Sequence, residues 1–421
     1  MNERKLVVIG QGYVGLPVAV RAAEVGFRVV GLDSDPVRVQ RLNDADSFVE
    51  DITSETLKTI IESGRYSAST DYGDAAGFDV AVITVPTPLN EGLPDLTFIE
   101  DSARALAPHL RPGVTVVLES TTYPGTTEEL VAPILEDGSG LSCISDFHLG
   151  YSPERIDPGN PTWGLVNTPK VVSGIGEAAT VAVNQFYSQL VERTVPVHSP
   201  KEAELTKLLE NTFRHVNIAL VNELAIYAYE LGIDVWESID AASTKPFGFM
   251  RFTPGPGVGG HCLPVDPSYL SWQVKRQLGR NFRFVELAND INDHMPEYVV
   301  RRLMTALNKR RACLNGARIL MLGFAYKRNT SDLRESPAEP LANMLLAHGV
   351  DLRICEPHKG TVRIPVDAPL VPFTAAELAE ADAVVVVTDH DDFDWDVVRE
   401  FAPYVLDTRN VVGHAANVEI L

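Results

Sequence analysis

One cysteine stands in an unusual run of residues, GPGVGGHCLPVDP, at positions 255–267. Glycine lets a main chain turn sharply, and proline fixes its direction, so this run predicts a shaped loop around the thiol. Gly259 and Gly260 remove side chains beside Cys262, and Asp266 follows it four residues later. A buried, inert cysteine needs no such setting, whereas a nucleophile that a substrate carbon must reach does. We therefore predict that Cys262 is a nucleophile.

A second group of polar residues lies in the segment ELTKLLENTFRH. Lys207, Asn211 and Arg214 have the spacing of one face of a helix. The neighbouring residues are mostly apolar, and an ammonium beside an amide would suit an alkoxide or carbonyl oxygen. The alternative is a solvated polar stripe, which is common on helices. The first interpretation predicts that this helix contributes to the same reaction as the cysteine.

Two loops carry further candidates. Glu154 stands between a proline and an arginine in YSPERIDPGN, at 151–160. Thr121 and Thr122 lie in ESTTYPGTT, which follows an expected strand, where doubly wound folds bind ligands. Their hydroxyls are candidates to meet a cofactor or a substrate. Ordinary turn chemistry is the alternative for both loops.

A glycine turn near the start of the chain has the pattern of a dinucleotide site. In KLVVIGQGYVG, Gly10 allows a tight turn, Gly12 lets the main chain approach a pyrophosphate, and Gly15 lets a helix pack on a strand. The helix then presents free N–H groups to the phosphates. Asp33 ends the next expected strand, where it can accept bonds from a ribose 2′-hydroxyl and would repel a 2′-phosphate. The pattern therefore predicts NAD rather than NADP.

Other residues around this turn are expected to contact the cofactor. Arg38 is placed to lie near the adenine, although a solvated helix residue is an equal alternative. The remaining expected contacts are Tyr13, Val14, Val85, Pro86 and Thr87. No metal ligands are expected.

The elements that position these residues read as an α/β fold. Strands are expected at Leu6–Ile9, 78–88 and 114–121, with helices between them. The same order returns in ARILMLGFAYK, PLANMLLAHGVDLRICEP and ADAVVVVTDHD, and the spacing from Gly26 to Asp33 recurs from Gly349 to Glu356. We predict two Rossmann-like, doubly wound domains. The second lacks the glycine pattern and is expected to bind a different ligand.

A long helix is expected between the two domains. The segment KEAELTKLLENTFRHVNIALVNELAIYAYELG has apolar residues at helical spacing and no interior glycine or proline before Gly232. A long helix that joins domains often supplies a dimer interface. We predict an NAD domain at 1–199, a central helical dimerisation and catalytic domain at 200–310, and a C-terminal domain at 311–421.

Composition narrows the classes of partner. The chain has 421 residues, 36 Lys and Arg against 57 Asp and Glu, and a formal charge of −21, which argues against nucleic acid and anionic membranes as partners. Its four cysteines lie far apart, which suits a reducing cytoplasm rather than a disulfide framework. The sequence shows no leader segment and no membrane-spanning run, so a cytoplasmic location is expected.

Seven motifs, in this order, resemble those of the nucleotide-sugar 6-dehydrogenases, the UDP-glucose and UDP-N-acetylhexosamine dehydrogenase family. They cover nearly the whole chain, and the cysteine loop is highly specific. The motifs are GQGYVGLP, VPTP, ESTTYPGTTEE, YSPERIDPGN, ELTKLLENTFRHVNIALVNE, GPGVGGHCLPVDP and GFAYKRNTSDLRESP. The resemblance implies an NAD domain, a central dimer-forming region and a C-terminal nucleotide-sugar domain.

The resemblance also implies an activity, the two-step oxidation of a sugar C6 alcohol to a carboxylate with reduction of two NAD. It implies that Cys262 is the nucleophile and that Lys207 and Asn211 stabilise the oxygen at C6. Asp266 is implied to assist the water or the lysine, and Glu154 and Thr122 to serve the water and proton steps.

For binding, the resemblance implies that Arg334 reaches the NAD. The residues expected at the nucleotide sugar are Tyr326, Lys327, Arg251, Arg155, Arg214 and Gly259, besides Glu154, Lys207 and Asn211.

Pro158 departs from the UDP-glucose branch, which often carries a second acid at this position; the motifs around it look more like the N-acetylhexosamine branch. UDP-glucose and UDP-N-acetylhexosamines both stay candidate substrates, with uracil or thymine as the base. One alternative activity is a single-step hydroxyacid dehydrogenase of the 6-phosphogluconate type, which needs neither the cysteine loop nor a second Rossmann-like domain. The other is a nucleotide-sugar sensor without catalysis.

Overall fold

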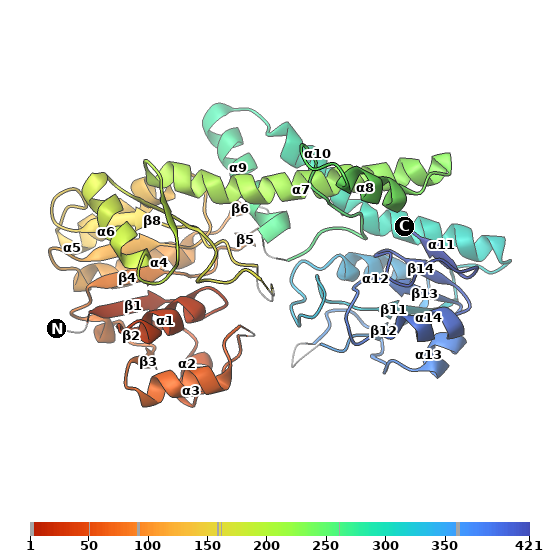
Figure 1. Ribbon diagram of the computed structural model, residues 1–421, viewed down its shortest axis with the longest axis horizontal. Coiled ribbons are helices and arrows are strands. Elements are labelled where there is room, and N and C mark those ends of the chain that lie inside the picture. The colour runs from red at the N-terminus through yellow and green to blue at the C-terminus, as the bar shows by residue number, and fades with distance from the viewer. Residues whose placement is uncertain are drawn as a thin grey trace. The chain divides into compact units, whose positions relative to one another are not determined.

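The computed structural model describes residues 4–49, 51–90, 93–157, 160, 162–260, 262–358 and 363–421. The chain divides into two compact units, Met1–Glu210 and Asn211–Leu421 (Figure 1). Each unit is built on a sheet of mainly or wholly parallel strands with helices on both faces. The predicted α/β fold with two Rossmann-like halves is therefore confirmed.

The sheet of the first unit has the strand order β10-β9-β8-β7-β4-β1-β2-β3. Strand β8 pairs with β9 in the antiparallel direction, whereas β1 pairs in parallel with both β2 and β4. The central strands are buried on both faces, which is why their sequences are almost continuously apolar. The strands are β1 (Lys5–Ile9), β2 (Arg28–Leu32), β3 (Tyr66–Ser69), β4 (Val80–Ile83), β7 (Thr115–Leu118), β8 (His148–Tyr151), β9 (Lys170–Gly174) and β10 (Thr194–Pro196), with a separate hairpin of β5 (Leu89–Asn90) and β6 (Leu93–Pro94).

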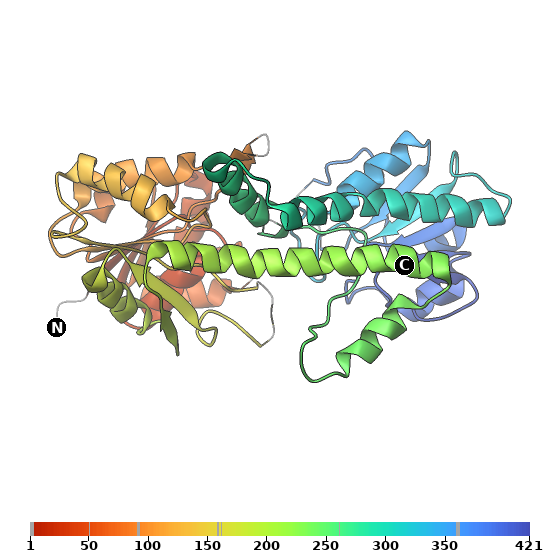
Figure 2. The same ribbon diagram turned by 90° about the horizontal axis from the view of Figure 1, so that it is seen from above.

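Helices cover both faces of this first sheet. Helices α1 and α6 pack on one face through a shared apolar core, and α4 and α5 lie on the opposite side (Figure 2). The helices are α1 (Gly15–Glu24), α2 (Pro36–Asn43), α3 (Ser54–Glu62), α4 (Thr97–Leu106), α5 (Ala132–Ser139) and α6 (Glu177–Tyr187), with short helical turns η1 (Tyr72–Ala75), η2 (Ala107–His109) and η3 (Thr127–Val131).

Two predicted strands are shorter than expected. The segment 78–88 forms β4 only over Val80–Ile83, which pairs with β1 as far as Ile9. Pro86 and Pro88, further along, have no N–H to extend the pairing. The segment 114–121 forms β7 over Thr115–Leu118, and the polar residues after it leave the sheet. These irregular ends carry candidate site residues.

The predicted long helix is α7 (Pro200–Leu231), which runs without a break for 32 residues (Figure 2). Proline at its first position is favourable, because the N–H that proline lacks would have no partner there. The helix stops before Gly232, whose φ of +69° is the left-handed conformation that ends helices. The division between the two units falls within α7, after Glu210.

The sheet of the second unit has the order β12-β11-β13-β14-β15, and its paired strands run parallel. One face packs on α11 and α12, and the other packs on α13 and α14. The strands are β11 (Arg318–Leu322), β12 (Asp351–Cys355), β13 (Ala383–Val386), β14 (Val405–Asp407) and β15 (Val418–Ile420).

Further helices lie before and between these strands. They are α8 (Val235–Ser243), α9 (Cys262–Leu278), α10 (Arg283–Asp293), α11 (Met295–Lys309), α12 (Ala338–Ala347), α13 (Ala375–Glu380) and α14 (Trp395–Phe401). Within the described part of the chain, no helix is both long enough and apolar enough to cross a membrane.

Candidate active site

The glycine turn between β1 and α1 has the space that a dinucleotide needs. Gly10 has a φ of +91°, and a Cβ on Gly15 would lie 1.8 Å from the Gly10 carbonyl oxygen, so both positions require glycine. A Cβ on Gly12 would meet nothing within 4 Å, so the turn is open on that side. No side chain caps the start of α1, where the Leu16 N–H donates to the Gly12 carbonyl oxygen at 3.1 Å and Pro17 has no N–H. The positive end of the helix dipole therefore faces the turn without a side-chain acceptor. These residues fit a bound pyrophosphate.

Asp33 is fixed at the end of β2, beside the glycine turn. Its two carboxylate oxygens accept bonds from the Gln11 N–H at 2.9 Å and the Asp35 N–H at 3.0 Å. The Arg38 guanidinium lies 3.9 Å from Asp33 and also faces the Phe48 ring. A carboxylate held this way can still accept a ribose hydroxyl, since each oxygen has a second lone pair. The arrangement fits the predicted preference for NAD.

The other predicted cofactor residues lie at the same edge of the sheet. Tyr13 and Val14 are in the glycine turn, and Tyr13 is exposed. Val85, Pro86 and Thr87 follow β4, which is the parallel neighbour of β1. The carboxyl ends of parallel neighbours meet at one edge, so the structure brings these residues together.

The threonine loop after β7 is tied to α7 by an acid that the sequence analysis missed. Glu204 is buried and accepts bonds from the Gly125 N–H at 2.5 Å, the Thr127 N–H at 2.9 Å and the Thr127 hydroxyl at 2.7 Å. Burial raises the pKa of Glu204 to about 7, and the three donors do not fully offset this. Thr122 is also buried, with its hydroxyl 2.6 Å from that of Thr126. Thr121 is half-buried. An acid within an apolar helix was the sequence signal that could have identified Glu204.

Glu154 lies in a buried charged cluster. Its carboxylate contacts the Lys170 ammonium at 3.1 Å, and Lys170 also contacts Glu119. Burial opposes the ionisation of Glu154, but Lys170 and the Ile156 N–H outweigh it and hold the pKa of Glu154 below its usual value. The Lys207 ammonium, also buried, donates to the main-chain oxygen of Glu154 at 2.6 Å. The structure therefore brings together two predicted catalytic residues, Glu154 and Lys207.

Asn211 and Asp266 meet in the second unit. The Asn211 amide donates to the Asp266 carboxylate at 2.5 Å, and Asp266 is almost fully buried. Cys262 is the first residue of α9, and Asp266 follows one turn later on the same helix. A helix N-terminus favours a thiolate over a thiol, because the free N–H groups carry partial positive charge. The side chain of Cys262 itself lies outside the described residues, so its predicted role stays a prediction.

The glycines before the cysteine pack against Tyr326. A Cβ on Gly259 would lie 2.8 Å from the Tyr326 Cβ, and one on Gly260, at a φ of +81°, would lie 2.7 Å from its ring. The Gly260 N–H also donates to the Arg334 carbonyl oxygen at 3.1 Å. From the sequence, we expect these glycines to leave space for the substrate to reach Cys262. Packing on Tyr326 already requires glycine at both positions. Gly259, Tyr326 and Arg334 are thereby brought together.

Most predicted arginines contact acids of their own unit. Arg155 contacts Glu210 at 2.6 Å and donates to the Pro169 carbonyl oxygen, Arg251 contacts Asp240 at 2.8 Å, and Arg334 contacts Asp332 at 2.7 Å. Arg214 is exposed on α7. The Lys327 ammonium lies 5.8 Å from the centre of the Tyr326 ring. Pro158 lies outside the described residues.

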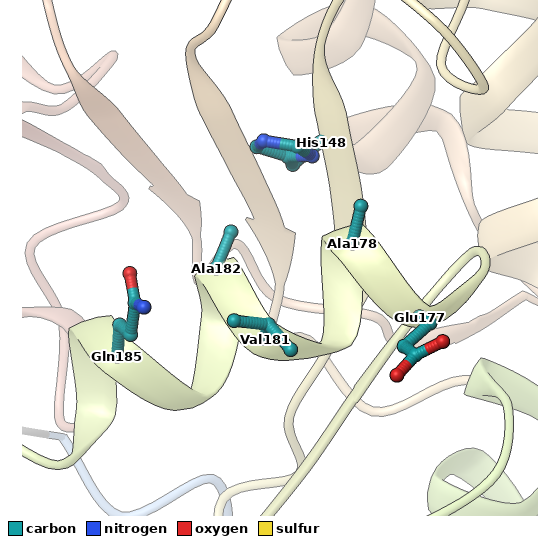
Figure 3. A pocket seen from close by; sticks show the side chains of 6 residues that line it. All are labelled: His148, Glu177, Ala178, Val181, Ala182 and Gln185. Atoms are coloured by element: carbon teal, nitrogen blue, oxygen red, sulfur yellow. The ribbon is translucent and has the colours of Figure 1, made fainter.

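A surface hollow of about 590 Å³ in the first unit is lined by residues of β8 and α6 (Figure 3). No predicted site residue lines it, so it is not the candidate site; its lining residues are His148, Glu177, Ala178, Val181, Ala182 and Gln185. In the described ranges, no three His, Cys, Asp or Glu residues are grouped as metal ligands.

Three models of one protein family match the chain in order. Residues 4–191 match the NAD binding domain, 201–294 the central domain and 320–414 the UDP binding domain of the UDP-glucose/GDP-mannose dehydrogenase family. The chain therefore belongs to this family and is an NAD-dependent nucleotide-sugar dehydrogenase. The predictions of the family and of NAD as cofactor are confirmed.

Individual relatives match over nearly the whole chain. A UDP-N-acetyl-D-mannosamine dehydrogenase of Pyrococcus horikoshii is 34% identical, over 97% of this chain and 96% of the relative. A UDP-N-acetyl-D-glucosamine 6-dehydrogenase of Pseudomonas aeruginosa is 35% identical, over 93% and 92%.

Solved structures of related enzymes also match this chain over nearly its whole length. The UDP-D-ManNAc dehydrogenase of Pyrococcus horikoshii has a TM-score of 0.89 at 33% identity, over 99% of this chain and 98% of that one. A UDP-glucose dehydrogenase of Pyrobaculum islandicum has a TM-score of 0.86 at 29% identity, over 100% and 97%.

Proposed function

We propose that this chain oxidises the C6 alcohol of a UDP-N-acetylhexosamine to the carboxylate, and that Cys262 holds the sugar covalently between the two oxidations. The position of Cys262 at the start of α9, one turn before the buried Asp266, carries the proposal. The choice of sugar is supported by the relatives that act on UDP-N-acetylmannosamine and UDP-N-acetylglucosamine. The motif around Glu154, with Pro158 in place of an acid, supports the same branch.

NAD, when bound, accepts a hydride from C6 in each of the two oxidations. The first oxidation leaves an aldehyde, and the Cys262 thiolate adds to its carbon to form a thiohemiacetal. This adduct again carries a C–H bond, so loss of a second hydride and a proton leaves a thioester. Water then adds to the thioester carbon, the thiolate leaves, and the carboxylate is released.

Four side chains are proposed to serve the oxygen and the protons. Lys207 and Asn211 donate to the oxygen on C6 as it gains negative charge, and one such donor is typically worth about 3–4 kcal/mol. Glu154, held as the anion, accepts protons or activates the water, and Asp266 orients Asn211 through their hydrogen bond. Thr122 is proposed to support the water step from the buried loop after β7.

The remaining assignments are part of the same proposal. Arg334 is proposed to contact NAD together with the glycine-turn residues and Arg38. The nucleotide sugar is proposed to contact Tyr326, Lys327, Gly259, Arg155, Arg214 and Arg251. The domain boundaries at 199 and 310, and a cytoplasmic location, stay predictions.

We also propose a homodimer through α7. This helix exposes large apolar side chains along its length. In a monomer they would face water, which is unfavourable, so they mark a surface that a second copy could cover. They are Leu205, Leu209, Phe213, Leu220, Leu224, Tyr227 and Leu231.

A substrate panel tests the proposed sugar. The purified protein is given NAD with UDP-N-acetylglucosamine, UDP-N-acetylmannosamine, UDP-glucose or TDP-glucose, and NADH formation is followed by absorbance. We expect the highest kcat/KM with one of the two N-acetylhexosamines. A higher value with UDP-glucose or TDP-glucose would overturn the choice of sugar, and no turnover with any of them would overturn the proposed activity.

A further inference from the structure

Three charged side chains lie buried together at one edge of the first sheet. Glu119 follows β7, Glu154 follows β8, and Lys170 is the first residue of β9. Their exposed fractions are 1%, 9% and 3%. Lys170 and Glu119 have no part in the proposed reaction. Because charged side chains are almost never buried without a reason, the cluster calls for an explanation.

The strand pairing brings these residues together. Strand β8 runs antiparallel to β9, with Tyr151 opposite Ser173. Continuing that register past the end of β8 sets Glu154 across from Lys170. Strand β7 is the parallel neighbour of β8, so Glu119 leaves the sheet at the same edge. The Lys170 ammonium thus lies between two carboxylates that come from different strands.

The two carboxylates are not equivalent. Glu154 accepts bonds from the N–H groups of Arg155 and Ile156, each at 2.6 Å, in addition to the Lys170 contact. Glu119 receives only a hydroxyl donor besides Lys170, the Tyr187 O–H at 2.8 Å, among the described hydrogen bonds. Burial raises the pKa of Glu119 to about 7, whereas the pKa of Glu154 is lowered. Near neutral pH the cluster therefore keeps its negative charge on Glu154.

The cluster also reaches the proposed oxygen-binding lysine. The Lys207 ammonium donates to the Glu154 carbonyl oxygen at 2.6 Å. The position of this oxygen therefore determines how the ammonium of Lys207 is oriented. The carbonyl belongs to a loop beyond β8. The Lys170 contact and the two N–H bonds fix the side chain of the same residue.

We propose that Lys170 is a positioning residue: its buried ammonium keeps the Glu154 carboxylate ionised and holds Glu154 where its carbonyl oxygen directs Lys207. Glu119 holds Lys170 in place by accepting a hydrogen bond from its ammonium. This inference rests on the proposed roles of Glu154 and Lys207. The titratable and charged groups that face the cluster come from β7, β9, α6, α7 and the loop itself, and they are Glu119, Lys170, Tyr187, Lys207, Glu210 and Arg155.

Two variants separate the charge of Lys170 from its effect on folding. Lys170→Met removes the ammonium and leaves two buried carboxylates with no cation between them. The double variant Lys170→Met with Glu119→Gln also removes the second carboxyl group. Above pH 7 it therefore leaves one buried carboxylate rather than two, and it should be more stable than Lys170→Met. Lys58→Met is the control, because Lys58 forms an exposed ion pair with Glu62 on α3, outside the site.

The first readout is the titration of Glu154 itself. The carboxyl infrared band that disappears on Glu154→Gln is followed against pH in the wild-type, Lys170→Met and double-variant backgrounds. We expect its midpoint to rise by about 1–3 pH units without Lys170. The second readout is the pH profile of kcat, whose acidic limb should move in the same direction, with a smaller change in KM. Lys58→Met should match the wild type in both.

An unchanged Glu154 midpoint in both variants would overturn the inference, even if kcat fell, because that fall would then be structural. A double variant that is less stable than Lys170→Met above pH 7 would overturn it as well, because removal of the second carboxylate should restore stability. If the wild type itself fails to oxidise any nucleotide sugar, the proposed function is wrong. The infrared titration reports on Lys170 independently of that outcome.

Discussion

At the scale of single residues, the reactivity of a cysteine depends on how its surroundings shift the pKa of its thiol. Cys262 is the first residue of α9. Burial raises the thiol pKa values of Cys143 and Cys355 to about 11 and about 12. Those two cysteines are therefore poor nucleophiles near neutral pH. Their exclusion supports the choice of Cys262.

Replacing Cys262 with serine tests the covalent step. The hydroxyl stays protonated near neutral pH and leaves poorly from an ester, so Cys262→Ser should stall after it captures the sugar. We expect a burst of NADH, a fall of at least about 10³-fold in steady-state turnover, and an adduct heavier by one sugar nucleotide in intact-mass measurement. Cys313→Ser is the matched control, because Cys313 is a free, exposed cysteine. Undiminished turnover of Cys262→Ser with two NADH per sugar would show that the covalent role is wrong.

Sequence alone predicted the residues whose chemistry is local. The glycine turn with Asp33 and the loop with Cys262 could be recognised because close spacing along the chain defines them. Lys170 and Glu119 were missed, since their contacts with Glu154 depend on strand register. A charged residue directly beside each apolar strand, in VTVVLE and KVVSG, was the available signal.

At the scale of elements, loops are held to the scaffold by single buried contacts. The cysteine loop packs on Tyr326 through Gly259 and Gly260, and the threonine loop is held to α7 by Glu204. Neither contact could be predicted from the sequence, because each joins segments distant along the chain. The long α7 and the strands on either side of the glycine turn could be predicted, since periodicity and apolar runs are local signals.

Adding a methyl group to the cysteine loop tests its packing. Gly260→Ala would place Cβ against the Tyr326 ring at a positive φ, so we expect lower stability and at least a tenfold loss of kcat/KM, equal to about 1.4 kcal/mol. Gly279→Ala is the control, because Gly279 also has a positive φ, +61°, but nothing lies within 4 Å of its Cβ position. It should lose stability through backbone strain alone and keep its activity. Equal loss of activity in both variants would contradict the role of the contact.

The pKa of Glu204 predicts a pH dependence of stability. In the folded chain burial raises the pKa of Glu204 from its usual value of 4.5 to about 7, so the folded state binds the proton more tightly. That stabilisation is complete below about pH 4.5 and is lost as the pH rises through about 7. Relative to Glu204→Gln, the wild type should lose up to about 3 kcal/mol of unfolding free energy between pH 4.5 and 8.

Thermal unfolding of the wild type and Glu204→Gln across this range measures the difference. Glu202→Gln, which changes an exposed acid in the first turn of the same helix, should run parallel to the wild type. Parallel curves for the wild type and Glu204→Gln would contradict the raised pKa.

At the scale of the whole molecule, the chain carries two nucleotide-binding folds. Helix α7 contributes its first residues to one unit and its remaining residues to the other. The family match spans both folds and the helix, and relatives match along nearly the whole length. The order of domains could be predicted because the strand and helix pattern repeats. The sugar could not, because it depends on side-chain contacts that no local pattern encodes.

Self-association is the prediction for the whole molecule. Sedimentation should give twice the monomer mass at micromolar concentration, and the net charge of −21 argues against nonspecific association as its cause. Charges placed on α7 by Leu220→Glu and Leu224→Glu together should yield monomers, because both side chains are exposed on the helix. Ile144→Glu, at another exposed apolar position, should leave the mass unchanged. A wild-type monomer would contradict the predicted interface.

The number of NADH molecules formed for each sugar consumed distinguishes a retained covalent intermediate from a single oxidation. A limiting amount of the preferred UDP-N-acetylhexosamine is oxidised to completion with excess NAD, and NADH and sugar products are quantified together. We expect two NADH and one uronic acid for each sugar, with no aldehyde released, because Cys262 is proposed to retain the intermediate. One NADH per sugar, with an aldehyde or ketone as the product, would contradict it.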